Sequence, residues 1–255
     1  MDGRARREGI VHLLEEHGRV RVAEISSQMN VSEVTVRRDL EALERHGVLI
    51  RVHGGAMPAP LSSREPPFAV RLMRKSEVKE RIGRVAADLI SPGETVVIDS
   101  GTTTISVARA LKDRHDLRVM ALSLHVAAEL IDEPGIEVLL PGGSVRSGEH
   151  ALSGTLTTAT LEGLQFDTAI LTVAGLSMKE GLTEYRLDDA EVKRSAFYRA
   201  RRRIAVTDSG KLGRATFKQY APVRDLTVLV TDDAAPAELL DDLRAADIDV
   251  RLVAS

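Results

Sequence analysis

Several residue types and patterns are missing from this 255-residue chain, and each absence excludes a class of protein. There is no cysteine, which excludes disulfide bridges and thiolate metal sites and fits a reducing compartment. No apolar run approaches the roughly 18 residues that indicate a membrane-spanning helix. The charged N-terminal stretch MDGRARREGI lacks the apolar segment of a secretion signal. We therefore expect a cytoplasmic protein that neither spans nor binds a membrane.

The chain also lacks an excess of positive charge. Its formal net charge is −3, and residues 1–57 carry nine arginines against nine acidic residues. Binding to a polyanion must then depend on where the arginines lie, because the overall charge does not favour it. The seven histidines are scattered along the chain, so we expect no metal site, and no motif indicates a cofactor.

The length suits two domains, one small and one medium-sized. Residues 58–67, PAPLSSREPP, contain four prolines and two serines, a composition typical of an extended linker. We therefore predict a first domain at 1–57, a proline-rich linker at 58–70 and a second domain at 71–255.

Three short helical patterns and a strand pair fill the first domain. The first pattern stops at Gly18, a residue type that often ends helices. A second runs from Val22 to Asn30, and a third starts at Ser32, an N-cap residue type, and ends before Gly47. The following VLIRVHGGA alternates apolar residues and contains a Gly-Gly pair, as in a β-ribbon with a tight turn. Three helices and such a ribbon predict a winged helix-turn-helix.

The third helix carries arginines in its first turns. At about 100° per residue, Val36, Leu40 and Leu43 form the core-facing stripe, and Arg38 lies opposite it. An ordinary solvated helix would show the same residues. The preceding helix and the following ribbon, however, favour a recognition helix in a DNA major groove, where arginine can donate two hydrogen bonds to guanine. The candidate DNA-binding residues are Ser32, Thr35, Arg37, Arg38, Arg51 and His53.

Beyond the linker, short β-branched runs alternate with helix-length segments. This alternation predicts an α/β fold with a doubly wound, mainly parallel sheet. The expected strands are Thr95–Asp99, Arg118–Leu122, Ile136–Leu140, Thr168–Val173, Arg203–Thr207, Leu226–Thr231 and Ile248–Val253. The expected helices are Lys79–Ile90, Thr103–Lys112, Leu124–Asp132, Asp188–Arg199 and Pro236–Ala246.

The stretch TVVIDSGTTTISVARAL joins the first of these strands to a helix through Gly101. Glycine lets a ligand approach the backbone closely, and threonine hydroxyls and helix N–H groups can converge on an anion. The stretch is neither a Walker loop nor a dinucleotide fingerprint, so it does not indicate ATP or NAD. Turns of this kind also cap helices without binding a ligand, and that alternative stays open.

Three other segments follow strands at the edge where open α/β sheets bind ligands. Their glycines and charged residues are Gly142 and Gly143 in LLPGGSVR, Gly175 in LTVAGL, and Asp208 and Lys211 in VTDSGKLG. Lys211 suits a phosphate or carboxylate partner, although a solvated loop lysine is the simpler interpretation.

The first domain closely resembles the N-terminal domain of DeoR-type transcriptional regulators. The resemblance covers nearly the whole domain and includes the segments VS, TVRRDL and HGGA in the same order. It implies operator binding through Thr35, Arg37 and Arg38, with Ser32 as cap and phosphate contact and the Arg51–His53 wing beside the duplex. Members of this family usually act as repressors and carry an effector-sensing domain after the DNA reader.

From about Arg71 to Asp232, the second domain is similar to the sensor domain of the same family. That domain looks like the fold of ribose-5-phosphate isomerases and coenzyme A transferases. The resemblance implies a phosphorylated sugar or related metabolite as effector. The implied ligand residues are Asp99, Gly101, Thr102, Thr103, Thr104, Gly142, Gly143 and Lys211, beside the further candidates Gly175 and Asp208.

Two departures from the family pattern affect the expected pocket. Ala121 and Leu122 stand where the family often has Thr-Asn, and Ala174 stands where many members have an acid. Both changes remove hydrogen-bonding groups from the expected pocket rim. The effector could therefore be a sugar phosphate or another metabolite. A third alternative is that the regulator has lost its ligand.

We predict a DNA-binding transcriptional regulator, a repressor of carbohydrate-metabolism genes that a phosphorylated sugar relieves, and no enzyme. The alternative is an isomerase-like enzyme with an appended DNA-binding head, but the fourth strand ends in LTVAGL without the carboxylate that a general base requires. Because a head with few cations neutralises few phosphates of operator DNA, we expect a homo-oligomer, a dimer or tetramer, on repeated half-sites.

Overall fold

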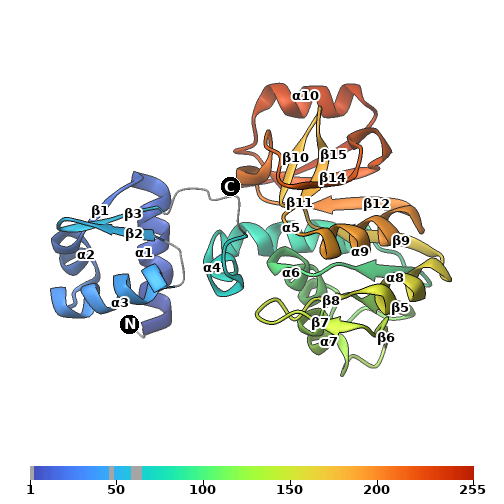
Figure 1. Cartoon of the computed structure of the whole chain (residues 1–255), viewed down its shortest axis with the longest axis horizontal. Helices are drawn as coiled ribbons and strands as arrows, with labels where there is room; N and C mark the ends of the chain where they lie inside the picture. Colours follow the sequence, from blue (N-terminus) through green and yellow to red (C-terminus); the bar gives the residue numbers. More distant parts are fainter. Residues whose placement is uncertain (1–2, 46–48, 59–64) are drawn as a thin grey trace. The chain divides into compact units, whose positions relative to one another are not determined.

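The computed structural model describes residues 3–45, 49–58 and 65–255. The chain divides into two compact units, an N-terminal unit at Met1–Ser76 and a C-terminal unit at Glu77–Ser255 (Figure 1). Helix α4 (Phe68–Met73) lies in the stretch where linker and second domain were expected to meet. The predicted limits of the linker stay a prediction, since residues 59–64 are outside the described part.

The N-terminal unit has the predicted winged helix-turn-helix fold. The elements of this fold are α1 (Gly3–His17), β1 (Val20–Arg21), α2 (Val22–Met29), α3 (Glu33–Arg45), β2 (Leu49–Val52) and β3 (Gly55–Pro58). Helix α4 also belongs to this unit, and its Val70 lies in the same apolar core. The three strands form one antiparallel sheet in the order β1–β3–β2, and the β2–β3 pair is the wing.

One apolar cluster holds these elements together. Val36, Leu40 and Leu43 of α3 are at most 1% exposed, and they share a core with Ile10 of α1 and Ile25 of α2. Burying each such side chain stabilises the fold by about 1.5–3 kcal/mol. The core-facing stripe predicted for the third helix is therefore confirmed.

Left-handed backbone positions end the elements at the expected places. Gly18 follows α1 with a φ of 66°, and Asn30 ends α2 with a φ of 52°. In the wing, a Cβ atom on Gly55 would lie 2.0 Å from the carbonyl oxygen of Val20. The close pairing of β3 with β1 therefore requires glycine at this position.

The C-terminal unit is built on a seven-stranded sheet in the order β15–β14–β12–β9–β4–β5–β6 (Figure 1). Its strands are β4 (Thr95–Ile98), β5 (Leu117–Ala121), β6 (Ile136–Leu139), β9 (Phe166–Leu171), β12 (Ala200–Val206), β14 (Val228–Asp232) and β15 (Asp249–Val253). All neighbouring strands in this sheet are parallel, which confirms the predicted α/β class.

Helices connect these strands, and two small antiparallel sheets lie beside the main one. The helices are α5 (Ser76–Asp88), α6 (Thr102–Ala110), α7 (Leu124–Leu130), α8 (Thr155–Glu162), α9 (Leu187–Tyr198) and α10 (Ala237–Ala245), with 3₁₀ turns η1 (Ser209–Lys211) and η2 (Val223–Asp225). The small sheets are β7 (Ser144–Val145) with β8 (Leu152–Ser153), and β10 (Gly175–Ser177) with β11 (Gly181–Glu184) and β13 (Lys218–Ala221). The sequence pattern did not predict these strands, because strands of two to four residues show little periodicity. It also did not predict α8, whose sequence TLTTATLE is rich in threonine and buries only Thr157 and Leu161.

The order of the strands reverses at β4. From β4 the chain moves outward through β5 and β6, and it then returns to place β9 on the other side of β4. Open α/β sheets bind ligands at the carboxyl edge beside such a reversal. The ends of β4 and β9 are therefore the expected position of a ligand site.

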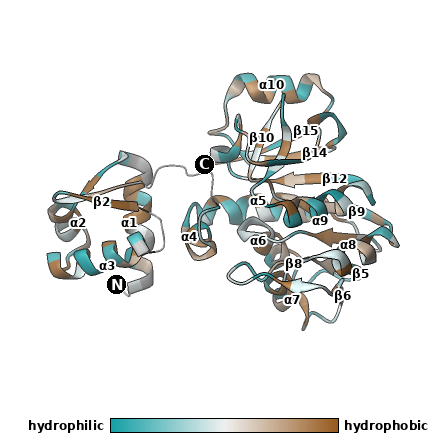
Figure 2. Cartoon of the chain, viewed as in Figure 1, coloured by the Kyte–Doolittle hydropathy of each residue, from teal (hydrophilic) through white to brown (hydrophobic). Residues whose placement is uncertain are grey.

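The interior of this unit is apolar. Val97, Ala169, Ile170 and Leu229 of the central strands are 0% exposed, and Figure 2 shows these strands as mostly hydrophobic. Nearly continuous apolar runs are expected when helices cover both faces of a parallel sheet. Within residues 3–45, 49–58 and 65–255, no helix is both long and apolar enough to cross a membrane.

Candidate functional site

Ser32 caps α3 as predicted. Its hydroxyl oxygen accepts a hydrogen bond from the Thr35 backbone N–H at 3.2 Å, and the two side-chain hydroxyls lie 2.9 Å apart. An N-cap of this kind stabilises a helix by about 1 kcal/mol. The cap fixes the first turn of α3, where the candidate DNA-binding residues begin.

Arg37, Arg38 and Glu41 are exposed on the side of α3 that faces away from the core stripe. Arg37 donates a hydrogen bond to Glu33 at 2.7 Å. Arg38 makes no hydrogen bond or ion pair with any described residue, so its guanidinium is available to a base edge. Val34, which the sequence analysis missed, is 57% exposed in the same turns and suits contact with a thymine methyl group.

Two further arginines of the N-terminal unit serve the fold. The carboxylate of Asp39, 4% exposed, accepts hydrogen bonds from Arg6 at 2.5 Å and from Arg7 at 3.4 Å. Since Arg6 and Arg7 belong to α1, these contacts fasten α1 to α3. The single Asp39 carboxylate therefore offsets one of these two positive charges within the unit.

Arg51 lies on the wing, but its side chain is bound to α3. Its Nε donates to Glu44 at 2.7 Å and its Nη1 donates to Glu41 at 2.9 Å, while its backbone N–H donates to Glu44 at 3.0 Å. The backbone and side-chain hydrogen bonds lower the pKa of Glu44, and its carboxylate raises the pKa of Arg51. His53 is exposed in the turn between β2 and β3, as expected for a residue of the wing.

In the C-terminal unit, the turn from β4 to α6 is buried and depends on glycine. Gly101 has a φ of 146°, and a Cβ atom there would lie 2.9 Å from Thr172 Cγ2. The Thr104 hydroxyl donates to the carbonyl oxygen of Gly101 at 2.9 Å and closes the turn. Thr102 and Thr103 are at most 5% exposed, and their hydroxyls form no hydrogen bond within the described part of the chain. With the first N–H groups of α6, they are donors available to an anion.

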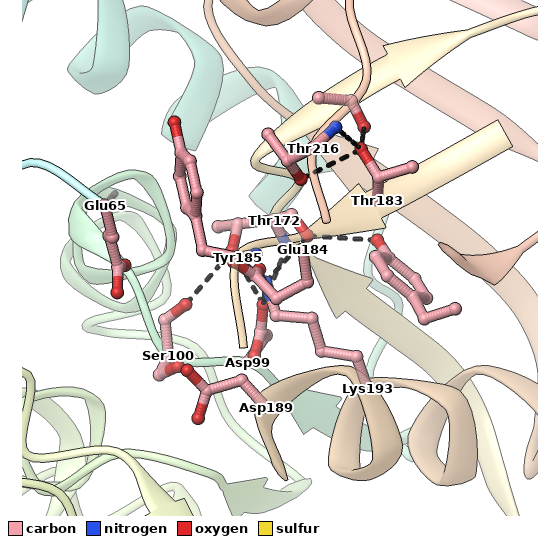
Figure 3. Close-up of polar contacts among 12 residues, drawn as sticks. Glu65, Asp99, Ser100, Thr172, Thr183, Glu184, Tyr185, Asp189, Lys193 and Thr216 are labelled. Carbon is pink, nitrogen blue, oxygen red and sulfur yellow. Dashed lines mark hydrogen bonds and ion pairs between the residues drawn. The ribbon is translucent and has the colours of Figure 1, made fainter. Parts of the chain in front are cut away.

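Asp99 belongs to a buried charge cluster that the sequence analysis missed (Figure 3). Lys193 Nζ lies 3.0 Å from Asp99 Oδ2 and 2.5 Å from Glu184 Oε2, and all three side chains are at most 6% exposed. Lys193 also donates to the carbonyl and hydroxyl oxygens of Thr172, at 3.0 and 2.9 Å. Thr172 in turn donates its N–H and hydroxyl to Asp99 at 2.9 and 2.7 Å. The cluster therefore connects the ends of β4, β9 and β11 to α9.

The ammonium group of Lys193 favours the ionised form of Glu184. Burial by itself raises the pKa of Glu184, but the charge and hydrogen bond of Lys193 outweigh burial and lower this pKa. Burial disfavours the Lys193 ammonium, yet Asp99 and Glu184 raise its pKa. Tyr220 donates its hydroxyl to Thr172 at 3.0 Å, and burial raises its pKa.

Glu184 lies beside the position of the expected but absent acid. The Ala174 N–H donates to the carbonyl oxygen of Thr183 at 2.9 Å, which places the following Glu184 next to Ala174 on the neighbouring strand. A carboxylate is thus present here after all, supplied by β11. Ala121 and Leu122 are at most 1% exposed, and Leu122 packs in the apolar core, so these two residues do not form an open rim.

Gly143 and Gly175 have packing roles, whereas Gly142 has a φ of 75° and a Cβ atom there would meet nothing within 4 Å. The Thr157 hydroxyl donates to the carbonyl oxygen of Gly142 at 2.8 Å, and a Cβ atom on Gly143 would lie 2.1 Å from the Thr157 hydroxyl oxygen. A Cβ atom on Gly175 would lie 2.6 Å from the carbonyl oxygen of Arg214. Their part in ligand binding stays a prediction.

Asp208 and Lys211 lie at η1, after β12. The Asp208 side chain accepts a hydrogen bond from the Gly210 N–H at 3.1 Å and caps the turn. The charge of Lys211 is the smallest of the contributions that lower the pKa of Glu184. Asp99 follows β4 and Lys211 follows β12, so both lie after parallel strands, at the carboxyl edge of the sheet where a ligand is expected.

Both units match families of known proteins. Residues 6–59 match the DeoR-like helix-turn-helix domain, and residues 74–233 match the DeoR C terminal sensor domain. The chain is 35% identical over 235 residues to the HTH-type transcriptional repressor GlcR of Bacillus subtilis (strain 168), covering 91% of this chain and 90% of that protein. It is 31% identical over 247 residues to the glycerol-3-phosphate regulon repressor of Escherichia coli (strain K12), covering 97% and 98%.

Among solved structures, the chain is similar to ribose 5-phosphate isomerase A from Methanocaldococcus jannaschii, with a TM-score of 0.41, 14% identity and 54% of each chain covered. The two family matches account for both units in their order along the chain, and they confirm a regulator over the isomerase-like alternative. The helix-turn-helix unit binds DNA, and the second unit is a sensor. This chain belongs to the DeoR family of transcriptional regulators.

Proposed function

We propose that this regulator represses genes of carbohydrate metabolism and that a phosphorylated sugar releases it from its operator. One relative is named as a repressor of the glycerol-3-phosphate regulon and another as the repressor GlcR. The observation that carries the effector proposal is the start of α6, where the hydroxyls of Thr102 and Thr103 have no partner in the described chain and adjoin the first N–H groups of the helix.

The remaining groups of the sensor site suit the other end of such a molecule. Asp99 provides a carboxylate, a group that accepts hydrogen bonds from sugar hydroxyls, and Lys211 adds a positive charge in η1, at the carboxyl edge of the sheet. Lys193 already faces four oxygen acceptors, so it has a positioning role. The proposed phosphate donors are therefore Thr102, Thr103, the α6 backbone and Lys211.

On the DNA side, Arg38 is the proposed base-reading residue, flanked by Thr35 and Val34. Ser32 and Arg37 are proposed to contact phosphates, and the wing residues Arg51 and His53 are proposed to lie along the duplex. Because residues 1–57 have no net charge, one head would bind weakly. We accordingly propose that the protein acts as a dimer or tetramer on repeated half-sites.

The DNA face is tested with Arg38→Ala on a duplex that the wild-type protein selects from a random library. Loss of a bidentate arginine–guanine contact is expected to weaken binding by about 1–3 kcal/mol and to relax the preference at one base pair. The matched control is Arg201→Ala, which removes an arginine of the sensor unit whose side chain is 88% exposed. Unchanged affinity and selectivity in Arg38→Ala would remove this residue from the proposed interface.

A further inference from the structure

Acidic residues lie directly beside the arginines of the proposed DNA face. Glu33 is bound to Arg37, and Glu41 and Glu44 are bound to Arg51. Two of the three arginines proposed to contact DNA therefore already have carboxylate partners, so negative charge lies directly beside the positive charge of this face. Arg38 differs, since it has no such partner among the described residues.

The contacts of Arg51 are more extensive than those of an isolated surface ion pair. Two carboxylates hold its guanidinium, and one of them also accepts its backbone N–H. The side chains are 42% exposed for Arg51, 52% for Glu41 and 38% for Glu44. Exposed ion pairs contribute only about 0–1 kcal/mol to stability. These carboxylates are therefore not required to hold the fold, whose α1–α3 contact depends on Asp39.

We propose that Glu41 and Glu44 determine the specificity of DNA binding by competing with DNA phosphates for Arg51. This inference rests on the proposed DNA face. A phosphate that approaches the wing must displace the carboxylates from Arg51, and the displaced carboxylates then repel the DNA backbone.

Such competition acts unequally on the two kinds of complex. Non-specific binding comes almost entirely from phosphate contacts, so the competition weakens it directly. A specific complex also gains base contacts through Arg38, which offset the repulsion. The two acids therefore lower non-specific affinity more than operator affinity, which suits a protein that must ignore a large excess of other DNA.

The test compares Glu41→Gln/Glu44→Gln with the wild type on two duplexes, one selected by the wild-type protein and one of random sequence. Binding is measured over a range of salt concentrations. Gaining one phosphate contact per head is expected to steepen the log–log salt slope by about 0.9 and to tighten random-duplex binding by about tenfold. The ratio of specific to non-specific affinity is expected to fall. The matched control, Glu80→Gln/Glu238→Gln, makes the same charge change at exposed residues of the sensor unit and is expected to change neither quantity.

Weaker binding to both duplexes with a shallower salt slope would overturn the proposal, because the carboxylates would then hold the wing in its DNA-binding form. Unchanged binding would also overturn it. The single variant Glu41→Gln keeps the Glu44 contacts to Arg51, so the wing stays attached to α3. Tighter binding of this variant to the random duplex would therefore come from the lost carboxylate charge and not from a change in the wing. If no preferred duplex can be selected, the proposed operator reading fails, while the random-duplex comparison still decides on Glu41 and Glu44.

Discussion

The ammonium group of Lys193 faces four oxygen acceptors, two from carboxylates and two from Thr172. Removing one partner from a buried ion pair costs about 3–5 kcal/mol, because the remaining charge stays desolvated. With its N–H donors used inside the protein, Lys193 positions the Asp99 carboxylate at the end of β4 and the Glu184 carboxylate at the end of β11. Lys193 therefore has a structural role in the sensor site, and the hydrogen-bond donors for a ligand come from other residues.

Glu184 is expected to make the stability of the sensor unit depend on pH. Its pKa in the folded chain lies below the ordinary value of 4.5 because of Lys193, against the effect of burial. Its contribution to stability is therefore fully present above about pH 4.5 and is lost as the pH falls through the folded pKa. In urea unfolding between about pH 7 and pH 3, the wild type should lose unfolding free energy more steeply below about pH 4.5 than Glu184→Gln.

The exposed Glu80→Gln serves as the control and should follow the wild-type curve. Parallel curves for Glu184→Gln and the wild type would show that Glu184 has the same pKa in the folded and unfolded states. The Lys193 contact would then have no energetic role at this carboxylate.

At the scale of elements, the turn between β4 and α6 was predictable from sequence, whereas the charge cluster was not. The turn is one continuous segment, with a strand, Gly101 and three threonines in a row. The cluster joins α9 to the ends of β4, β9 and β11, and no local spacing relates residues so far apart. One signal was present: Lys193 falls on the same helical face as Ala190, Ala196 and Phe197, all buried, and a lysine on an apolar face indicates a buried ion pair.

Gly101→Ala tests whether the β4–α6 turn needs its glycine for ligand binding. The added methyl group would meet Thr172 Cγ2 at 2.9 Å at a φ of 146°, so we expect a loss of about 1–3 kcal/mol in stability and weaker binding of phosphate compounds. Gly93→Ala is the matched control, because its φ is also positive, at 86°, but the nearest atom lies 3.6 Å away, in ordinary contact. Thermal unfolding and calorimetric titration with sugar phosphates measure the two effects. If both substitutions had equal effects, the loss of stability would come from the positive φ alone, and the contact with Thr172 would have no special role.

At the scale of the whole molecule, the order of the two units was predictable because each has its own periodicity and the proline-rich segment separates them. The ion pairs that the acidic residues form were not predictable, because a count of nine arginines and nine acidic residues does not show which of them are partners. The structure assigns Asp39 to the fold and Glu33, Glu41 and Glu44 to the arginines of the DNA face. A head of this kind has few free cations, which is the physical reason to expect more than one head on each operator.

The measurement that tests the central claim most directly is operator binding by the wild-type protein, followed by fluorescence anisotropy, during titration with sugar phosphates and their unphosphorylated counterparts. Coupling between the two units of typical size, about 1–3 kcal/mol, predicts that one phosphorylated sugar weakens operator binding by about 5- to 150-fold. Its unphosphorylated counterpart should have no effect, because the donors at the start of α6 would lack an anion. An operator affinity that no phosphorylated compound changes, or that both forms change equally, would contradict the account.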